Sequence, residues 1–466
     1  MGEKPLKIAF VAGEPSGDRQ GAALLSALQE QSAPQSVEAW GIGGHFLKEA
    51  GGRLRHNSDP WAAIGIADTL AKIPHMLWVL EDMKRALRRD PPDALVLIDA
   101  GAFNVPLAAW VKANAICPVF YYFPPGSWRR QAGGRKGKSN LAAVTDRIVT
   151  PFPWSQELLR QSGAEAYFVG HPLLDLVKPA LTDMEYYERF GLDPHRPLVA
   201  LLPGSRQGEI RHILPTLLGA AGEITRRIAG VQFVLALSSS GVRRLTEDLI
   251  RREQRAGGHA ARLHLLMTQA GDKLAQIAHS TLTPPAPRLA TNEGWTLPAK
   301  DALPETVGRT APAHSGPAPL VICEGLTWDV LARCDLALTK SGTATLEAMI
   351  LKKPMVIVYR GSRLMVLEWR LRRRSLNIAH IGLPNILADE RLFAELIQDE
   401  ATPEAIADLA VDLLLQPGRI LALKERLHDL VRDNLGEPGG VGRASALLLE
   451  MIAARNSGVS LAVSDK

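Results

Sequence analysis

The segment Lys7-Ile-Ala-Phe-Val-Ala-Gly-Glu-Pro-Ser-Gly-Asp18 sets the pattern for the whole chain. Its first part, residues 7–12, is a short apolar run that predicts a buried strand. A glycine-containing turn follows, and a helical pattern then extends over about residues 17–31. A strand, a turn and a helix in this order begin a βαβ unit, which places parallel strands in one sheet covered by helices.

The same rhythm continues along the chain and restarts after Pro197. We predict strands at 94–99, 119–122 and 147–151, and then at 198–202, 232–237, 263–267, 321–323, 336–339 and 355–359. The expected fold class is therefore α/β, with two doubly wound, Rossmann-like domains at 1–178 and 190–435. A C-terminal helix near 440–460 is a candidate to complete the first domain. Residues 281–319, rich in Pro, Ala and Thr, read as a surface insertion without assigned chemistry.

The composition narrows the range of partners. The chain has 466 residues, and its formal charge of +5 gives a mild bias toward phosphates or acidic lipid surfaces that is too weak to indicate nucleic acid. Its three cysteines have neither disulfide nor metal-ligand spacing, which favours a reducing compartment. We read no signal peptide and no run of about 18 apolar residues, so any membrane contact is expected to be peripheral.

A basic and apolar stretch at 363–374 predicts an amphipathic helix, with Trp369 and leucines opposite a cationic face. Two interpretations stay open: a helix that is half core-facing and half solvated, or a helix that lies on a membrane surface.

The turn after the first strand is the first candidate binding site. In a doubly wound sheet this turn lies at the carboxyl ends of the strands, where glycines let the backbone approach a ligand. The turn lacks the G-x-G-x-x-G pattern, which disfavours dinucleotide binding. The alternative is a tight turn in which Ser16 or Asp18 caps the helix. The candidate substrate-binding residues are Gly13, Glu14, Ser16, Gly17 and Asp18.

Asp99 follows the apolar run 94–98 and is the candidate general base. A carboxylate at the end of a buried strand is expected to be partly desolvated and able to accept a hydroxyl proton. The alternative is an aspartate that caps a helix or braces a loop. Asn104, shortly after it, is a candidate substrate contact.

In the second half, the strand 198–202 ends in a turn that carries Gly204, Ser205 and Arg206. The arginine could neutralise a diphosphate leaving group with a fork geometry that lysine cannot match, or it could be a solvated surface side chain. Gly204 and Ser205 are candidate nucleotide contacts in the same turn.

A second turn, Ser341-Gly342-Thr343, stands between a strand and a helix. Free backbone N–H groups at this helix start would hold phosphate oxygens, and Glu347 could accept hydrogen bonds from ribose hydroxyls. A capping role for Ser341 and Thr343 alone is the competing interpretation.

Taken in order, these motifs resemble the lipid-A-disaccharide synthase family over nearly the whole chain outside the Pro-rich segment. The matching stretches are Val11-Ala-Gly-Glu-Pro-Ser-Gly-Asp18, Trp40-Gly-Ile-Gly-Gly44, Ile64-Gly65, Leu97-Ile-Asp-Ala100, Phe103-Asn104, Val169-Gly-His-Pro172, Leu201-Leu-Pro-Gly-Ser-Arg206, Ser341-Gly-Thr-Ala-Thr-Leu-Glu347, Pro354-Met-Val356, Tyr359-Arg360 and Leu383-Pro-Asn385.

The resemblance implies a GT-B fold with two domains that face a central cleft. It implies inverting transfer of 2,3-diacylglucosamine from its UDP-sugar to 2,3-diacylglucosamine 1-phosphate, which yields a β-1,6 disaccharide and UDP. The lipid acceptor would bind the first domain and the UDP-sugar the second, at the inner face of the cytoplasmic membrane and without a metal or cofactor. Carried over by position, Asp99 would be the base, Arg206 and the 341–343 turn would hold the diphosphate, and Glu347 the ribose. Asn385 and Gln398 would be further contacts.

Two departures from the family pattern concern the acceptor half. Gly101-Ala102 replaces Pro-Asp, and Trp128-Arg129-Arg130 replaces Trp-Ala-Trp. The added arginines could favour a more anionic acceptor or simply solvate a loop.

The sequence is therefore compatible with several functions. A lipid glycosyltransferase, with this acceptor or a related one, would release UDP only with an acceptor present. A UDP-sugar epimerase or hydrolase of the same architecture would turn over without one, and a non-catalytic membrane-associated protein would only bind. His171, near the domain junction, has a hinge or packing role as one interpretation and a catalytic role as the other. An oligomer is compatible with all of these functions.

Overall fold

The structure is a computed structural model that describes residues 4–62, 66–124, 141–237, 240–257, 262–266, 318–361 and 380–457. The chain divides into two compact units. Unit 1 consists of Met1–Val177, Ser362–Glu390 and Glu425–Lys466, and unit 2 of Lys178–Gly361 and Arg391–Lys424. The amphipathic stretch 363–374, the substituted positions 129–130 and nearly all of the Pro-rich segment lie outside the described residues.

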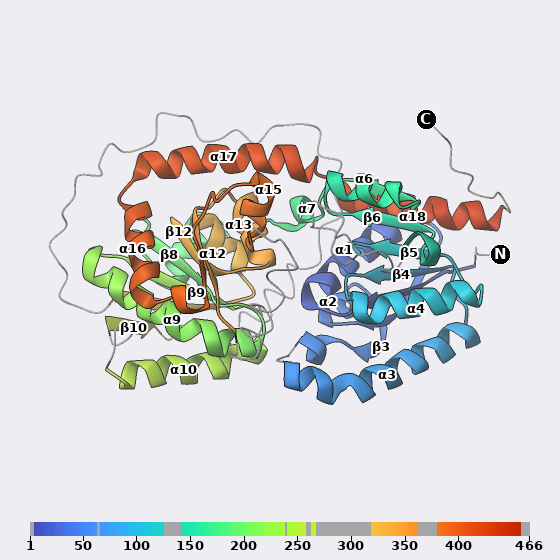
Figure 1. The fold of residues 1–466 in the computed structure, drawn as a ribbon, viewed down its shortest axis with the longest axis horizontal. Coiled ribbons are helices and arrows are strands. Elements are labelled where there is room, and N and C mark those ends of the chain that lie inside the picture. The colour runs from blue at the N-terminus through green and yellow to red at the C-terminus, as the bar shows by residue number, and fades with distance from the viewer. Residues whose placement is uncertain are drawn as a thin grey trace. The chain divides into compact units, whose positions relative to one another are not determined.

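Unit 1 is built on a parallel sheet of seven strands in the order β3-β2-β1-β4-β5-β6-β7 (Figure 1). Ala9 in the central strand pairs with Trp40 on one side and with Leu95 on the other. The strands are β1 (Leu6–Ala12), β2 (Val37–Gly43), β3 (Arg53–Asn57), β4 (Ala94–Ile98), β5 (Val119–Tyr122), β6 (Arg147–Thr150) and β7 (Ala166–Phe168).

Apolar side chains that alternate along these strands form two cores, one on each face of the sheet. One core contains Val11 and Leu97 and is covered by α3 and α4; the other contains Phe10 and Ile98 and is covered by α1 and α18. The helices of this unit are α1 (Pro15–Gln31), α2 (His45–Glu49), η1 (Asp59–Ala62), α3 (Ile66–Arg89), α4 (Gly101–Ala113), α5 (Leu141–Val144), α6 (Pro153–Gln161), α7 (Leu173–Leu176), α15 (Leu383–Ala388) and α18 (Gly440–Asn456).

The last helix, α18, returns to the first unit although it lies at the other end of the sequence. Arg147, a buried cation of β6, donates a hydrogen bond of 2.8 Å to the carbonyl of Leu447. Arg443 donates to the carbonyl of Val169 at 2.8 Å. The core of unit 1 is therefore completed by residues from the C-terminal part of the chain.

Unit 2 repeats the plan with a parallel sheet in the order β10-β11-β9-β8-β12-β13-β14. Helix α17 (Pro417–Leu435) begins in this unit and ends in unit 1. The strands are β8 (Leu198–Leu202), β9 (Gln232–Leu237), β10 (Leu263–Leu266), β11 (Ala318–Glu324), β12 (Leu336–Lys340), β13 (Met355–Tyr359) and β14 (Glu395–Ile397). The helices are α8 (Asp183–Phe190), α9 (Gln207–Arg227), η2 (Ser240–Val242), α10 (Arg243–Arg255), α12 (Thr327–Arg333), α13 (Thr343–Ile350), η4 (Gln398–Glu400) and α16 (Pro403–Leu414).

The predicted α/β class with two doubly wound sheets is confirmed, and strands β5, β8, β9 and β13 have the predicted bounds. Strand β11 begins at Ala318, so the segment predicted as an insertion up to residue 319 ends earlier. Four strands, β2, β3, β7 and β14, are not predicted from the sequence. Strands β3, β7 and β14 are short edge strands, and the apolar pattern of β2 is interrupted by Gly41 and Gly43. Within the described residues, no helix is both long and apolar enough to span a bilayer.

Each sheet has one point where the strand order reverses direction. In unit 1 this switch point lies between β1 and β4, and in unit 2 between β8 and β12. In doubly wound sheets ligands bind beyond the carboxyl ends of the strands at such points. The candidate site residues are therefore best considered as two half-sites, one in each unit.

Candidate active site

The first half-site is formed by the loops that follow β1 and β4. A Cβ atom on Gly13 would lie 2.7 Å from Cβ of Ala100, and a Cβ on Gly17 would lie 3.2 Å from Cγ2 of Ile98. A side chain at Gly13 would force the two loops apart, because real Cβ atoms do not approach so closely, whereas a side chain at Gly17 would require Ile98 to shift slightly. The structure thus brings the glycine-containing turn and the Asp99 segment together, as expected for two loops at one switch point.

Asp99 and Ala100 both have left-handed backbones, with φ of 48° and 40°. Such conformations are costly for residues other than glycine and persist where the surroundings hold them. Here the Tyr121 hydroxyl donates to the Asp99 carbonyl at 2.7 Å, and the Asn104 amide donates to the carbonyls of Asp99 and Ile98 at 3.0 and 3.1 Å. Asn104, which is fully buried, therefore braces the strained backbone; a contact of Asn104 with substrate stays a prediction.

The environment of Asp99 differs from the expectation of partial desolvation. Asp99 is exposed, because it stands just past the buried part of β4. Burial and the nearby charge of Asp99 both raise the pKa of Tyr121 far above its ordinary value, so its hydroxyl stays a hydrogen-bond donor. The carboxylate is thus held on a rigid backbone in contact with solvent.

Asp18 has a clear structural role in the same half-site. Its buried carboxylate accepts hydrogen bonds from the backbone N–H groups of Gly44, Phe46 and Leu47 at 2.7, 2.9 and 3.2 Å. Burial raises the pKa of Asp18, while these hydrogen bonds act in the opposite direction. The N-cap of α1 is Glu14, so the alternative in which Ser16 or Asp18 caps that helix is wrong; Asp18 instead holds the start of α2.

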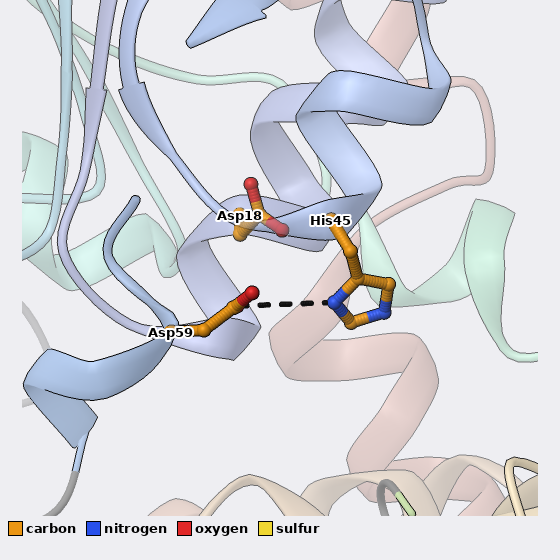
Figure 2. A group of neighbouring side chains, drawn as sticks. All are labelled: Asp18, His45 and Asp59. Atoms are coloured by element: carbon orange, nitrogen blue, oxygen red, sulfur yellow. Dashed lines mark ion pairs between the residues drawn. The ribbon is translucent and has the colours of Figure 1, made fainter. Parts of the chain in front are cut away.

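Asp18 also lies close to His45 and Asp59 (Figure 2). Among the described residues, these three side chains form the one group whose potential metal-ligand atoms all lie within 4.8 Å of one another. The His45 Nδ1 atom is 3.8 Å from Asp59 Oδ1, and both side chains are nearly half exposed. The residues are too far apart in sequence to have been recognised as a group. Because Asp18 already serves three N–H groups and the other two are solvated, we assign the group no chemistry.

The second half-site is formed by the loop after β8 and the turn after β12. Strand β8 pairs directly with β12, which places Leu202 opposite Thr339. An ion pair joins the two loops: Lys340 Nζ lies 2.8 Å from Oε1 of Glu209, and the same oxygen lies 3.8 Å from Nη1 of Arg206. Two cations therefore share one carboxylate at this switch point.

Glu209 also fixes the backbone of the β8–α9 loop. Its Oε2 atom accepts the N–H groups of Ser205 and Arg206 at 3.1 and 3.3 Å. A Cβ atom on Gly204 would lie 2.4 Å from the same oxygen, and the φ of Gly204 is 118°. This position therefore requires glycine both for its conformation and for the close approach of Glu209.

The turn after β12 has the strand–turn–helix form that was predicted. Gly342 is the N-cap of α13, with φ of 152°. The Ser341 N–H donates to the Val358 carbonyl at 3.1 Å and ties the turn to β13, so a phosphate at the helix start would use the N–H groups that follow it. Thr343 at the helix start is exposed, and Glu347 is partly buried one turn further on. Binding of phosphate by this turn, and of ribose by Glu347, stay predictions.

The two remaining candidate contacts fall into different units. Asn385 is fully buried in α15, within the segment grouped with unit 1. Gln398 begins η4 in unit 2, where its Oε1 atom accepts the N–H of Gly361 at 3.3 Å. Each residue therefore has a local structural setting, and a shared role in binding remains a prediction.

His171 is a packing residue. It is buried against Phe123 and Phe152, with ring centroids 5.7 and 5.8 Å away, and its Nδ1 atom accepts the Leu173 N–H at 3.1 Å. Burial lowers its pKa to about 3. A neutral ring held in this way favours the packing interpretation over the catalytic one.

Comparison with known proteins decides what these half-sites belong to. The family model described as lipid-A-disaccharide synthetase matches residues 8–276 and 311–438. The lipid-A-disaccharide synthase of Syntrophus aciditrophicus is 34% identical over 446 residues, which cover 96% of this chain and 97% of the relative. That of Geobacter metallireducens is 32% identical, with 97% and 99% covered.

The chain belongs to the lipid-A-disaccharide synthetase family. This family membership makes the protein a glycosyltransferase, as the motifs had implied. Solved structures that resemble it share the fold at low identity. They include UDP-GlcNAc 2-epimerase from Neisseria meningitidis, described as bound to UDP-GlcNAc, with a TM-score of 0.52, 12% identity and 97% and 100% of the two chains covered. The calicheamicin glycosyltransferase has a TM-score of 0.52, 14% identity and the same coverage. The predicted GT-B architecture is thereby confirmed.

Three residues that shape the half-sites of this family member were not predicted. Tyr121 lies near the end of β5, Lys340 ends β12 directly before Ser341, and Glu209 follows Arg206 by three residues. The spacing of Arg206 and Glu209 is that of a helix N-terminus in which the acidic side chain reaches back, which is a signal the sequence does carry. The contacts of Tyr121 and Lys340 depend on strand pairing and have no such local signal.

Proposed function

We propose that this protein transfers 2,3-diacylglucosamine from its UDP-sugar to 2,3-diacylglucosamine 1-phosphate, with inversion, to form a β-1,6 disaccharide and UDP. The proposal is supported by relatives named lipid-A-disaccharide synthase that match over nearly their full length. It also agrees with the chemistry of the two half-sites.

The observation that carries the proposal is the opposite charge of the two switch points. The first presents Asp99 on a braced backbone, and the second presents Arg206 and Lys340 around Glu209. Glycosyl transfer needs a base for the attacking hydroxyl and positive charge for the departing diphosphate. A carboxylate in one unit and cations in the other supply these two functions.

In the proposed reaction Asp99 accepts the proton of the acceptor's 6-hydroxyl group as its oxygen attacks the anomeric carbon of the donor. The bond from that carbon to the diphosphate breaks on the opposite face, which inverts the configuration. Arg206 compensates the charge that develops on UDP, since a guanidinium fork matches two phosphate oxygens. Glu347 would hold the ribose, and the turn that carries Gly13 would line the acceptor site.

A lipid acceptor requires access to a membrane surface. On α3 the side chains of Ile73, Leu77 and Trp78 are 43%, 57% and 55% exposed, which is unusual for large apolar residues on one helix segment. Ile73 and Leu77, four residues apart, are neighbours on the helix surface, and Trp78 follows Leu77 directly. We propose that this segment contacts the inner face of the cytoplasmic membrane.

The membrane contact can be tested with vesicles that contain anionic phospholipid. The double variant Leu77→Ser/Trp78→Ser is expected to sediment with vesicles several-fold less than the wild type. Leu421→Ser, which alters a residue 57% exposed on α17, is the matched control and should not change sedimentation. Equal sedimentation of all three proteins would contradict the assignment of α3.

The reaction itself is tested by incubating the purified protein with both sugar lipids and identifying products by mass. A disaccharide 1-phosphate with four acyl chains and an equal amount of UDP is expected, and no UDP should form when the acceptor is omitted. UDP release without acceptor would indicate a hydrolase, and a new UDP-sugar isomer would indicate an epimerase. Either result would overturn the proposed transfer.

A further inference from the structure

Lys340 is the last residue of β12, and its ammonium group lies against the turn that begins α13. A Cβ atom placed on Gly342 would be 3.1 Å from Lys340 Nζ. This is an unusual place for a cation, because the start of a helix carries partial positive charge. An anion is therefore needed near Lys340 to stabilise this arrangement.

Glu209 supplies that anion, and its carboxylate is shared with other donors. Its Oε1 atom lies 2.8 Å from Lys340 and 3.8 Å from Arg206, while its Oε2 atom accepts the N–H groups of Ser205 and Arg206. One carboxylate is thus shared by two cationic side chains and two backbone donors. Lys340 and Arg206 thus approach the same carboxylate at the point where β8 and β12 end.

The Lys340–Glu209 pair is accessible and replaceable. The side chains of Lys340 and Glu209 are 21% and 17% exposed, and that of Arg206 is 33% exposed. Ion pairs in contact with water contribute little to stability, so an incoming anion with more charge can take over one partner. Glu209 would keep its two backbone hydrogen bonds after losing Lys340.

We propose that Lys340 is a further diphosphate-binding residue. When the UDP-sugar binds, the ammonium group of Lys340 moves from the Glu209 carboxylate to a phosphate of the nucleotide. Glu209 is then a positioning residue that holds the cation and the Ser205–Arg206 backbone in the absence of ligand. The inference rests on the proposed function, because it assigns Lys340 to the diphosphate of that donor. It adds a point charge to the guanidinium fork of Arg206.

The test is calorimetric binding of UDP, UMP and uridine to the full-length protein. Lys340→Met is expected to weaken UDP binding by about 10-fold or more, because a charge-assisted contact to phosphate is lost, and to leave uridine binding unchanged. Lys340→Arg should retain most of the UDP affinity. Lys178→Met, at an exposed lysine of the same unit, is the matched control and should bind UDP like the wild type.

Glu209→Gln tests the exchange separately. The amide oxygen can still accept the two backbone N–H groups, but the competing charge is gone, so UDP binding is expected to stay the same or tighten. Unchanged UDP affinity in Lys340→Met, or an equal loss of uridine affinity, would overturn the assignment of Lys340. Weaker UDP binding in Glu209→Gln, at an unchanged midpoint of thermal unfolding, would overturn the proposal that Lys340 exchanges Glu209 for a phosphate. If the wild type binds no UDP, the proposed donor itself is wrong, which separates that failure from the failure of Lys340.

Discussion

The two switch points have the same topology and opposite chemistry. Both lie beyond paired parallel strands, β1 with β4 and β8 with β12, and both contain glycines that a neighbouring residue approaches closely. At the first, Asp99 stands on a left-handed backbone braced by the neutral side chains of Tyr121 and Asn104. At the second, cations surround a single carboxylate. The topology therefore fixes where a ligand binds in each unit, and the charge of the side chains there fixes the part that each switch point plays in the reaction.

The largest effect is expected when the negative charge of the first half-site is removed. Asp99→Asn should lower kcat by about 10²- to 10⁴-fold, because general-base catalysis is lost while the amide keeps the shape of the side chain. Binding of UDP, assigned to the other unit, should not change in calorimetry. Asp90→Asn alters a partly exposed aspartate just before the amino end of β4 and serves as the control. Equal activities of the two variants would remove Asp99 from the reaction.

The matching change in the second half-site replaces Arg206 with lysine. Arg206→Lys keeps the charge but loses the bidentate fork, so kcat is expected to fall by about 10²-fold, and UDP should bind more weakly. Steady-state kinetics and UDP titration measure the two effects. If Arg206→Lys lowered activity and left UDP affinity intact, the role of Arg206 would be confined to the transition state.

A third change tests the bracing of Asp99. Asn104→Leu removes the donor to two carbonyls inside the protein and is expected to lower the free energy of unfolding by about 1–3 kcal/mol, together with kcat. Asn114→Leu, at the exposed C-cap of the same helix, removes a hydrogen bond to the Trp110 carbonyl and one from Arg88, and should have a small effect because both are exposed to solvent. Denaturant titration and kinetics distinguish the two. Full activity in Asn104→Leu would show that the backbone at Asp99 needs no brace.

The smallest expected effect is on pH-dependent stability, at a residue outside both half-sites. The pKa of His171 is lowered to about 3 in the folded protein from an ordinary 6.5. As the pH falls, the histidine of the unfolded chain therefore binds a proton at a higher pH than that of the folded protein. The buried neutral ring of His171 therefore contributes fully to the free energy of unfolding above about pH 6.5. This contribution is lost as the pH falls toward 3, and about 2 kcal/mol of it is lost at pH 5. In His171→Asn the stability difference between pH 7 and pH 5 should shrink by this amount.

The control for this measurement is His428→Asn, at an exposed histidine of α17. Urea unfolding at the two pH values should show no such change for that variant. A pH dependence that persists in His171→Asn would assign the acid sensitivity to other groups.

The residues near Asp99 show which structural features can be predicted from the sequence and which cannot. The apolar run 94–98 correctly predicts a strand, because hydrophobic periodicity is a local property. The expectation that Asp99 is partly desolvated is wrong, since exposure depends on how the chain leaves the sheet. Asp18 is predicted to bind substrate, with capping of α1 by Ser16 or Asp18 as the alternative, and in the structure its carboxylate holds the start of α2. Such long-range partners are not encoded by spacing.

The amino-acid sequence by itself determined the alternation of strands and helices, the two-part α/β plan and the family, because apolar periodicity and short motifs are readable along one dimension. The tertiary structure was needed to find which donors brace Asp99, that Glu209 serves Arg206 and Lys340 together, and which core residues the helix after Gly439 packs against. Such contacts include the hydrogen bond between Arg147 and Leu447, which are 300 positions apart, and they arise from strand order and close approach of loops, which a linear pattern does not contain.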